Sequence, residues 1–434
     1  MRKRLAVVTA GCKANFAESA GIASRALRAG FDVVPPGAPA DVLIINSCTV
    51  THRADRDSRA MARRLRRKNP AAVLVMTGCF ARVSPDARGT VPEADHWIGA
   101  RDPGELDRLL RTLADGVPGE IEEPSAYAVD RLLGHTRTFL RIQDGCDAAC
   151  AYCIVPKARG SGRSVPAGEA VAEARRAEAD GAREIVLTGI HAGRYGADRG
   201  ELDGLANLLE ELLSATSACR FRLGSVEPLE ITPRLVRLIA SGKRVCPHLH
   251  VPMQSGSDAV LRRMRRPYTS GQYREKLEAV RSCAPDARLG ADVMAGFPGE
   301  TEKDFAETLE RIAESPLSYL HAFPYSPRPG TESAAWRDGV CAAEKKRRVG
   351  MLLAADGAMR KGYLEAQAGR TLSVIAESET GEAERKTLKG TSENYIEVVF
   401  PAGSAEVGEL VAVRILGARN GKLEGRIEGD DGRA

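Results

Sequence analysis

The chain has 434 residues, more than one ordinary domain holds, and this length predicts about two to four domains. Hydrophobic residues make up 43% and charged residues 28%, which is typical of a soluble globular protein and excludes a disordered or fibrous chain. The formal net charge of +5 is compatible with a polyanionic partner without requiring one.

The N-terminus superficially resembles a secretory signal that ends at a lipidated cysteine. Three basic residues precede an apolar run over residues 5–10, and Gly11 and Cys12 follow. This run is shorter than the roughly 7 to 15 residues of a working signal core, and no apolar stretch approaches the roughly 18 residues of a membrane span. We therefore expect residues 5–10 to form a buried strand and the protein to be cytoplasmic, with no membrane partner.

Residues 1–125 are expected to form an open α/β sheet domain. Three apolar runs predict buried strands: residues 5–10, 42–46 and 73–77. Two amphipathic segments predict helices: residues 15–29 and Arg53–Lys68.

Each of these strands leads directly into a cysteine, and the three are Cys12, Cys48 and Cys79. In open α/β sheets, ligands bind beyond the carboxyl ends of the strands, so we expect the three thiols to meet at one edge. The alternative, three unrelated buried cysteines, accords less well with this shared placement. In a reducing compartment, ten cysteines favour metal binding or catalysis over disulfides.

Residues 132–365 are expected to form a partial (β/α)6 barrel. Six strands are predicted, over residues 138–143, 184–189, 220–226, 248–253, 289–295 and 319–325. Five helices alternate with them, over residues 167–180, 202–214, 233–240, 271–282 and 302–314. This number of units is too small for a full eight-unit barrel, so a partial barrel with its site at the strands' carboxyl ends is the economical interpretation.

The sharpest motif follows the first barrel strand, where Cys146, Cys150 and Cys153 have C-x3-C-x2-C spacing. Three thiolates in one short loop can hold three irons of a cubane cluster and leave the fourth iron open. A structural zinc site ordinarily needs a fourth protein ligand, and none lies nearby in the sequence.

Residues 366–434 are expected to form a small antiparallel β-barrel. Short alternating segments separated by glycine-containing turns predict its strands, over residues 371–377, 395–400, 410–415 and 422–426.

These motifs resemble the radical-SAM superfamily, and nearly the whole chain is similar to the methylthiotransferases within it. The matching stretches are residues 11–15, 46–50, 77–79, 142–146, 156–160, 248–250, 254–257, 296–300 and 323–326. The C-terminal barrel is similar to a TRAM domain, an RNA-binding module.

The resemblance assigns a role to each cysteine set. Cys146, Cys150 and Cys153 would bind a 4Fe–4S cluster that cleaves S-adenosylmethionine (SAM). Cys12, Cys48 and Cys79 would bind an auxiliary 4Fe–4S cluster whose open iron holds the sulfur being methylated. Two SAM molecules are implied per turnover, one as methyl donor and one as radical source.

Candidate SAM contacts lie at the strand ends and in the cluster loop. Thr188 and Gly189 end the second barrel strand, and a glycine there lets backbone groups approach the methionine moiety. Ser225 and Glu227 end the third strand on one shared face, and Tyr152 lies between cluster cysteines. The alternative for each of the five is ordinary barrel packing or capping.

Other polar groups have less specific signals. His248 and His250 alternate onto one face, which metal-binding pairs also do, but the family needs no third metal centre, so a satisfied core position is favoured. Helix Arg53–Lys68 carries a basic stripe that either contacts phosphates or is only solvated. The C-terminal barrel is the better RNA candidate, because of the basic residues Arg385, Lys386, Lys389, Arg414, Arg419 and Lys422.

Three substrates compete within the family: threonylcarbamoyladenosine in tRNA, isopentenyladenosine in tRNA, and an aspartate of a ribosomal protein. Residues 11–15, 54–56, 142–146 and 159–164 look most like the threonylcarbamoyladenosine group. The resemblance then implies methylthiolation at C2 of that adenosine at position 37, next to the anticodon.

The implied partners are the anticodon loop of tRNA, an electron donor such as flavodoxin or ferredoxin, and a sulfur source. Deleting residues from 366 onward is expected to weaken tRNA binding and to spare SAM cleavage. An alternative of another class is a non-catalytic iron–sulfur protein that binds RNA. A structural cubane usually has four protein thiolates, however, and both sets here stop at three.

Overall fold

The computed structural model describes residues 2–83, 89–99, 103–114, 124–242, 244–337, 339–381 and 386–429. The chain divides into two compact units. Unit 1 comprises Met1–Gly181, Leu187–Gly200 and Ser326–Ala334, and unit 2 comprises Ala182–Val186, Glu201–Tyr325 and Ala335–Ala434. Each unit combines segments that are distant in the sequence, whereas the sequence predicted three consecutive domains. Those three domains stay a prediction.

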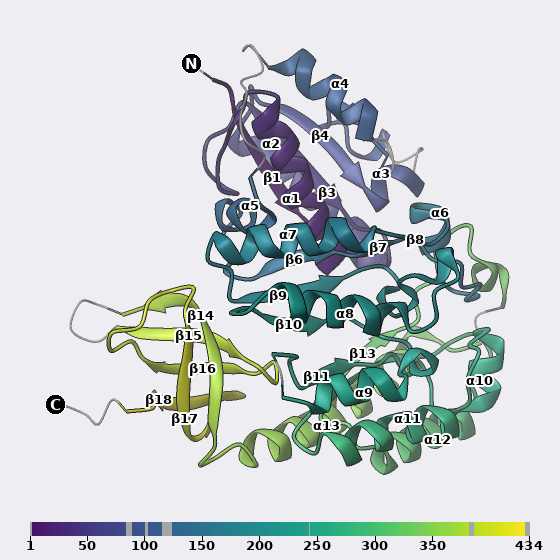
Figure 1. Cartoon of the computed structure of the whole chain (residues 1–434). Helices are drawn as coiled ribbons and strands as arrows, with labels where there is room; N and C mark the ends of the chain where they lie inside the picture. Colours follow the sequence, from purple (N-terminus) through teal and green to yellow (C-terminus); the bar gives the residue numbers. More distant parts are fainter. Residues whose placement is uncertain are drawn as a thin grey trace. The chain divides into compact units, whose positions relative to one another are not determined.

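Unit 1 begins with a parallel five-stranded sheet in the order β2-β1-β3-β4-β5, of which Figure 1 labels β1, β3 and β4. The strands are β1 (Arg4–Thr9), β2 (Asp32–Val33), β3 (Val42–Ser47), β4 (Val73–Gly78) and β5 (His96–Trp97). Side chains alternate between its two faces, so Leu5, Val7 and Ile44 enter one core while Ala6, Leu43 and Ile45 enter the other. The open α/β sheet is confirmed.

Helices cover both faces of this sheet. Helices α1 (Lys13–Arg28), α4 (Pro103–Leu113) and α5 (Ala126–Leu132) supply the apolar residues that pack on the first face. Helix α2 (His52–Lys68) buries Ala62 and Leu65 against the second face, and α3 (Cys79–Val83) follows β4 directly. Unit 1 then continues through β6 (Thr138–Arg141), β7 (Gln143–Asp144), α6 (Val155–Arg159), β8 (Arg163–Ser164) and α7 (Ala167–Ala179).

The six strands expected for the partial barrel are present in the structure. Strand β9 (Glu184–Thr188) is divided between the two units: in unit 1, Ile142 donates to the carbonyl of Thr188, and in unit 2, Arg220 donates to the carbonyl of Arg183. In unit 2, β10 (Arg220–Leu223) is followed by a parallel sheet of β11 (His248–His250), β12 (Arg288–Ala295) and β13 (Tyr319–Pro324). Bridges from Phe221 to Val245 and from Ser225 to His250 link β10 with β11.

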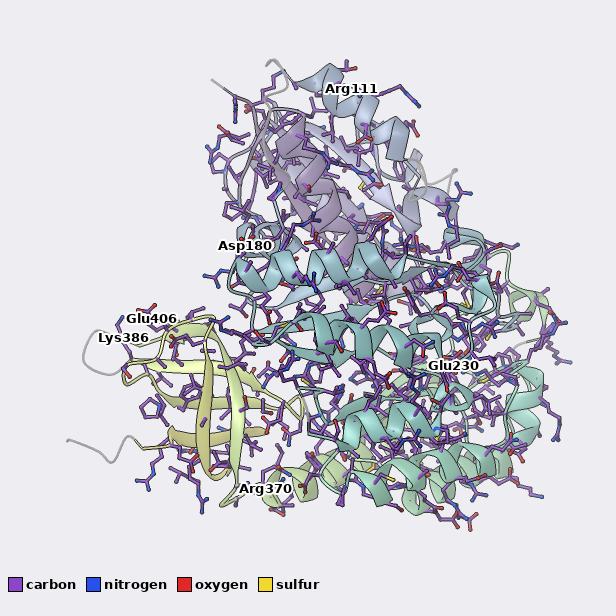
Figure 2. All side chains as sticks on the ribbon, viewed as in Figure 1. Arg111, Asp180, Glu230, Arg370, Lys386 and Glu406 are labelled. Atoms are coloured by element: carbon purple, nitrogen blue, oxygen red, sulfur yellow. The ribbon has the colours of Figure 1, made fainter. Side chains whose placement is uncertain are left out.

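Amphipathic helices alternate with these strands. They are α8 (Gly204–Ala215), α9 (Pro233–Ala240), α10 (Asp258–Arg263), α11 (Ser270–Cys283) and α12 (Glu302–Glu314). A long helix that was not predicted, α13 (Ala342–Glu365), contacts β13 and leads to the C-terminal barrel. Arg370 lies where α13 meets that barrel and pairs with Asp286 at 2.7 Å (Figure 2).

The C-terminal segment forms a closed barrel in the order β14-β15-β16-β18-β17. Its strands are β14 (Thr371–Thr380), β15 (Thr387–Ser392), β16 (Glu397–Pro401), β17 (Leu410–Arg419) and β18 (Lys422–Ile427). Sequence patterning predicted the small barrel and missed β15, because Leu388 is its only large apolar residue. Gly390 of β15 is needed for close packing, since a Cβ there would lie 2.2 Å from the carbonyl oxygen of Ile375.

Buried arginines attach the C-terminal barrel to β10 within unit 2. Arg220 donates to the carbonyls of Ser373 and Thr391 at 2.7 and 3.1 Å. Arg222 donates to the carbonyls of Ser392 and Glu393 at 3.0 and 2.9 Å. Both guanidinium groups pair with the fully buried carboxylate of Glu184, which balances one of their two positive charges. No helix in the described ranges is long and apolar enough to cross a membrane.

Candidate functional site

The three cysteines that follow the N-terminal strands lie at one edge of the sheet. Cys12 precedes α1, Cys48 follows β3, and Cys79 begins α3. A Cβ on Gly11 would lie 3.0 Å from the Cβ of Cys48, so the first two loops touch. Burial raises the pKa of Cys48, and the nearby Cys12 thiol raises it further, while Cys48 in turn raises the pKa of Cys79.

Buried amide side chains fix the first two of these loops. The Asn15 side chain donates to Oδ1 of Asn46 at 3.1 Å, and the Asn46 side chain donates to the carbonyl of Asn15 at 3.0 Å. At the third loop, Gly78 has φ of +89° and its Cα lies so close to Ser47 that a Cβ would be 2.4 Å from the Ser47 carbonyl oxygen. The glycine before Cys79 is therefore a geometric requirement of the edge.

A buried arginine from α6 completes this edge of unit 1. Nε of Arg159 donates to Sγ of Cys79 at 3.1 Å, and its two terminal nitrogens donate to the carboxylate of Glu18 at 3.1 and 3.0 Å. Burial raises the pKa of Cys79 to about 12, although Arg159 opposes the shift. Burial lowers the pKa of Arg159, but Glu18 and Cys79 raise it more, so the guanidinium stays charged.

The second set of cysteines lies in a loop that closes on itself. The amide of Cys146 donates to the carbonyl of Gly160 at 2.9 Å. Gly145 has φ of +76°, and a Cβ there would lie 2.0 Å from the carbonyl oxygen of Ser161, so only glycine fits. Cys146, Cys150 and Cys153 are all half-buried, which leaves the loop open to a ligand.

Cys146 has an electrostatic partner that sequence reasoning missed. Its Sγ lies 3.3 Å from Nδ1 of His191, and the amide of Ala148 approaches it at 3.4 Å. Burial alone would raise the pKa of Cys146, but these contacts lower it below its ordinary value. A thiolate is the form that binds iron, so the loop favours the ligand form of this residue.

Segment Ser326–Ala334 binds both cysteine loops within unit 1. Arg328 is buried and donates to Thr49 Oγ1 and Asp55 Oδ2, each at 2.6 Å, directly beside Cys48. The amide of Ser333 donates to the carbonyl of Ala151 at 2.9 Å, between Cys150 and Cys153. The same short segment therefore holds both loops in place.

The geometry of the two sets fits clusters better than single zinc ions. Three thiolates bound to one zinc ion at about 2.3 Å each would lie within about 4 Å of one another. Among the described residues, the only three metal-binding side chains whose ligand atoms all lie within 4.8 Å of one another are His250, Asp292 and His321. Both cysteine sets are wider, as a group with one iron per thiolate requires.

The five candidate SAM contacts fall into both units. Tyr152 is half-buried in the cluster loop, and the carbonyl of buried Thr188 accepts from Ile142. Gly189 packs so closely on Gln143 that a Cβ would lie 3.0 Å from its side-chain oxygen. These three residues belong to unit 1, and their contact with SAM stays a prediction.

Ser225 and Glu227 belong to unit 2. Ser225 is exposed and bridges to His250 of β11. The carboxylate of Glu227 pairs with the buried guanidinium of Arg266, and its side chain also caps the 3-10 turn Pro228–Glu230. Glu227 thus has a structural role already, and its contact with SAM also stays a prediction.

Ion pairs divide the basic residues into two classes. On the C-terminal barrel, Lys386 pairs with Glu379, while Lys389 and Lys422 both pair with Glu397. Within the described part of the barrel, three exposed arginines have no ion pair: Arg414, Arg419 and Arg426, the last of which was not singled out from the sequence. Lys386 lies on the barrel in Figure 2, whereas Arg385 lies outside the described residues.

Part of the basic stripe on α2 is used inside the protein. Arg66 donates to Asp95 and to the carbonyls of Glu93 and Ala72, and Arg59 lies over the ring of Phe80. The residues that stay exposed with no ion pair to described groups are Arg56, Arg63, Arg64, Arg67 and Lys68. Whether this helix contacts RNA stays a prediction.

Two family models match the chain. The model described as the radical SAM superfamily matches residues 140–312, which include the C-x3-C-x2-C loop. The model described as uncharacterized protein family UPF0004 matches residues 4–99, which include Cys12, Cys48 and Cys79.

Curated relatives match nearly the full length. The threonylcarbamoyladenosine tRNA methylthiotransferase MtaB of Bacillus subtilis is 37% identical over 96% of this chain and 95% of its own. MtaB of Aquifex aeolicus is 35% identical over 95% of this chain and 100% of its own. The tRNA-2-methylthio-N(6)-dimethylallyladenosine synthase of Desulfitobacterium hafniense is 30% identical over 99% of this chain and 98% of its own.

Among solved structures, the fold is similar to that of the radical S-adenosylmethionine methyltransferase TsrM from Kitasatospora setae, solved with cobalamin and a [4Fe-4S] cluster. The TM-score is 0.56 at 14% identity, over 77% of each chain.

Proposed function

The chain belongs to the radical-SAM methylthiotransferase family, and from this membership we propose that it inserts a methylthio group at C2 of N6-threonylcarbamoyladenosine in tRNA, at position 37 next to the anticodon. Both groups of relatives, MtaB and the dimethylallyladenosine synthases, are named for methylthio chemistry on tRNA, which supports action as a tRNA methylthiotransferase. The observation that carries the finer assignment is the full-length identity of 34–37% to MtaB from three bacteria, against 30–33% for four dimethylallyladenosine synthases.

Each turnover uses two 4Fe–4S clusters and two SAM molecules, one SAM as methyl donor and one as radical source. Cys146, Cys150 and Cys153 hold the cluster that supplies the electron for SAM cleavage, and Cys12, Cys48 and Cys79 hold the auxiliary cluster. Tyr152, Thr188, Gly189, Ser225 and Glu227 are the candidate SAM contacts. The convergence of each cysteine set within unit 1 supports this assignment.

The chain's own groups orient and protect these sites. Arg159 donates a hydrogen bond to the sulfur of Cys79 and fixes its direction, while Arg328 holds the Cys48 loop. Acid–base side chains cannot readily activate the C–H bond at C2 of adenine, so the cofactor would supply the radical chemistry. The protein would position the substrate and exclude water. The reaction is proposed to take place in the cytoplasm, with an electron donor such as flavodoxin or ferredoxin and a separate sulfur source.

A side-by-side assay tests the substrate assignment. The cluster-loaded enzyme is offered threonylcarbamoyl-modified tRNA, isopentenyl-modified tRNA and the ribosomal protein under identical anaerobic conditions. We expect the methylthio product on the first substrate. Product on either of the other two, with none on the first, would contradict the substrate and leave the reaction class intact.

A further inference from the structure

A group of metal-ligand side chains lies in unit 2, away from all six cysteines in sequence. It comprises His250 on β11, Asp292 on β12 and His321 on β13, three neighbouring parallel strands. The residue register pairs His250 with Gly290 and Asp292 with His321, which places the three side chains on one face of the sheet. We propose that this group binds one divalent transition-metal ion of the zinc type.

The ligand atoms are already close to coordinating distances. Nε2 of His250 lies 3.0 Å from Oδ1 of Asp292, and Nδ1 of His321 lies 3.4 Å from the same oxygen. Around a tetrahedral zinc ion with bonds of about 2.0–2.2 Å, two ligand atoms are about 3.3–3.5 Å apart. Small side-chain shifts therefore suffice to admit an ion.

The chemistry of the group matches a metal with an open position. Two imidazoles and one carboxylate are the ligands of catalytic zinc sites and of the non-haem iron facial triad. Asp292 presents its carboxylate to both imidazoles, because Oδ1 lies within 3.4 Å of a ring nitrogen of each histidine. Its side chain is 28% exposed and that of His321 is 57% exposed, so an ion can enter from solvent.

Neighbouring groups orient the buried ligand. Nδ1 of His250 lies 3.0 Å from the hydroxyl of Tyr319, which also lies 2.9 Å from Nε2 of His248. A histidine that gives Nε2 to a metal carries its proton on Nδ1, and the Tyr319 oxygen accepts that proton in a hydrogen bond. Metal-ligating histidines ordinarily have such a second partner, whose loss lowers metal affinity about 10–100-fold. The residues supplying the site lie on strands, which hold ligands more precisely than loops do.

The alternative is a hydrogen-bonded polar cluster that takes no ion, and zinc titration distinguishes the two. The enzyme with both cluster sites loaded with iron is freed of loosely bound metal by a chelator and titrated with Zn²⁺, with zinc and iron measured after dialysis. We expect one Zn²⁺ per chain. Asp292→Asn and His321→Gln should each weaken zinc binding at least about tenfold without changing the iron content.

His96→Gln, a histidine substitution in unit 1, is the matched control and should bind zinc as the wild type does. Because His321 is largely exposed, His321→Gln removes a ligand without disturbing the core. Zinc binding that persists unchanged in both site variants would show that the ion binds elsewhere and would overturn the proposal. Absence of zinc binding by the iron-loaded wild type would overturn it as well.

Discussion

Arg159 is buried between a carboxylate and a thiol that lie far from it in the sequence. Its partners Glu18 and Cys79 are 141 and 80 residues away, so no local pattern could have indicated the interaction. By contrast, Cys12, Cys48 and Cys79 could be singled out from the sequence, because a predicted strand leads into each of them. Spacing therefore identified the candidate ligands, and only the folded chain shows which groups surround them.

Replacing Arg159 with Gln should remove the auxiliary cluster while leaving the first one. The variant leaves the partly buried carboxylate of Glu18 without its partner, which should lower the unfolding free energy by up to about 3 kcal/mol. Iron should fall from about eight to about four per chain, by one cluster of four. Arg64→Gln, an exposed arginine on α2, should change neither quantity. Full iron and wild-type stability in the Arg159→Gln variant would show that Arg159 does not position Cys79.

Asp130 predicts a pH effect of definite sign. Burial raises its pKa well above the ordinary value, although the amide of Phe139 donates to it at 3.0 Å. The native carboxyl keeps its proton at a pH where the unfolded chain releases it, above about 4. Its contribution to stability is therefore full at acidic pH and is lost as the pH rises toward the folded pKa.

Asp130→Asn should accordingly raise the unfolding free energy relative to wild type at pH 7 and change it little at pH 4. Denaturant titration of both proteins at the two pH values measures the difference. An effect of equal size at both pH values would mean that Asp130 does not retain its proton in the native state.

At the scale of elements, the C-terminal barrel shows what sequence patterning resolves and what it does not. Alternating apolar residues predicted the barrel, but the sequence could not show which of its basic residues are paired. Lys389 and Lys422 both pair with Glu397. Arg414 and Arg426 lie opposite each other on β17 and β18 and have no ion pair among the described residues. The unpaired arginines are the better candidates for phosphate contact.

The double variant Arg414→Gln and Arg426→Gln should weaken tRNA binding and flatten its salt dependence. Each lost phosphate contact should reduce the slope of log affinity against log salt by about 0.7, or about 1.4 for both. Lys422→Gln is the control and should have the smaller effect, because Lys422 already pairs with Glu397. A double variant with wild-type affinity and slope would exclude this face of the barrel.

Deleting the barrel is a poorer test than the sequence suggested. Arg220 and Arg222 are buried by carbonyls of residues 373 and 391–393, so a chain that ends at residue 365 would expose both arginines and Glu184. Loss of tRNA binding by the truncated chain would then be inseparable from loss of stability.

The sequence analysis also missed the long helix α13, since its apolar residues follow no clear helical stripe.

For the whole molecule, the order of strands was predictable and the grouping into compact units was not. Hydrophobic runs and turns determine the order of strands. The grouping into units depends on how segments such as Ser326–Ala334 pack against the cysteine loops. This return brings Arg328 to the Cys48 loop and Ser333 to the Cys150 loop, which supports two cluster sites in one unit.

The two cysteine sets should fail differently. Replacing Cys146, Cys150 and Cys153 with Ala should halve the iron and abolish reductive cleavage of SAM to 5′-deoxyadenosine. Replacing Cys12, Cys48 and Cys79 should also halve the iron but leave that cleavage and remove only methylthio transfer. If the second variant is folded, retains four irons and still cannot cleave SAM, the proposed division of roles is wrong.

The most direct test of the central claim is nucleoside analysis of tRNA from a strain that lacks this gene. We predict that 2-methylthio-N6-threonylcarbamoyladenosine disappears, that N6-threonylcarbamoyladenosine accumulates, and that the wild-type gene restores the product whereas a Cys48→Ala gene does not. An unchanged level of that nucleoside, with loss instead of the methylthio derivative of isopentenyladenosine, would contradict the account.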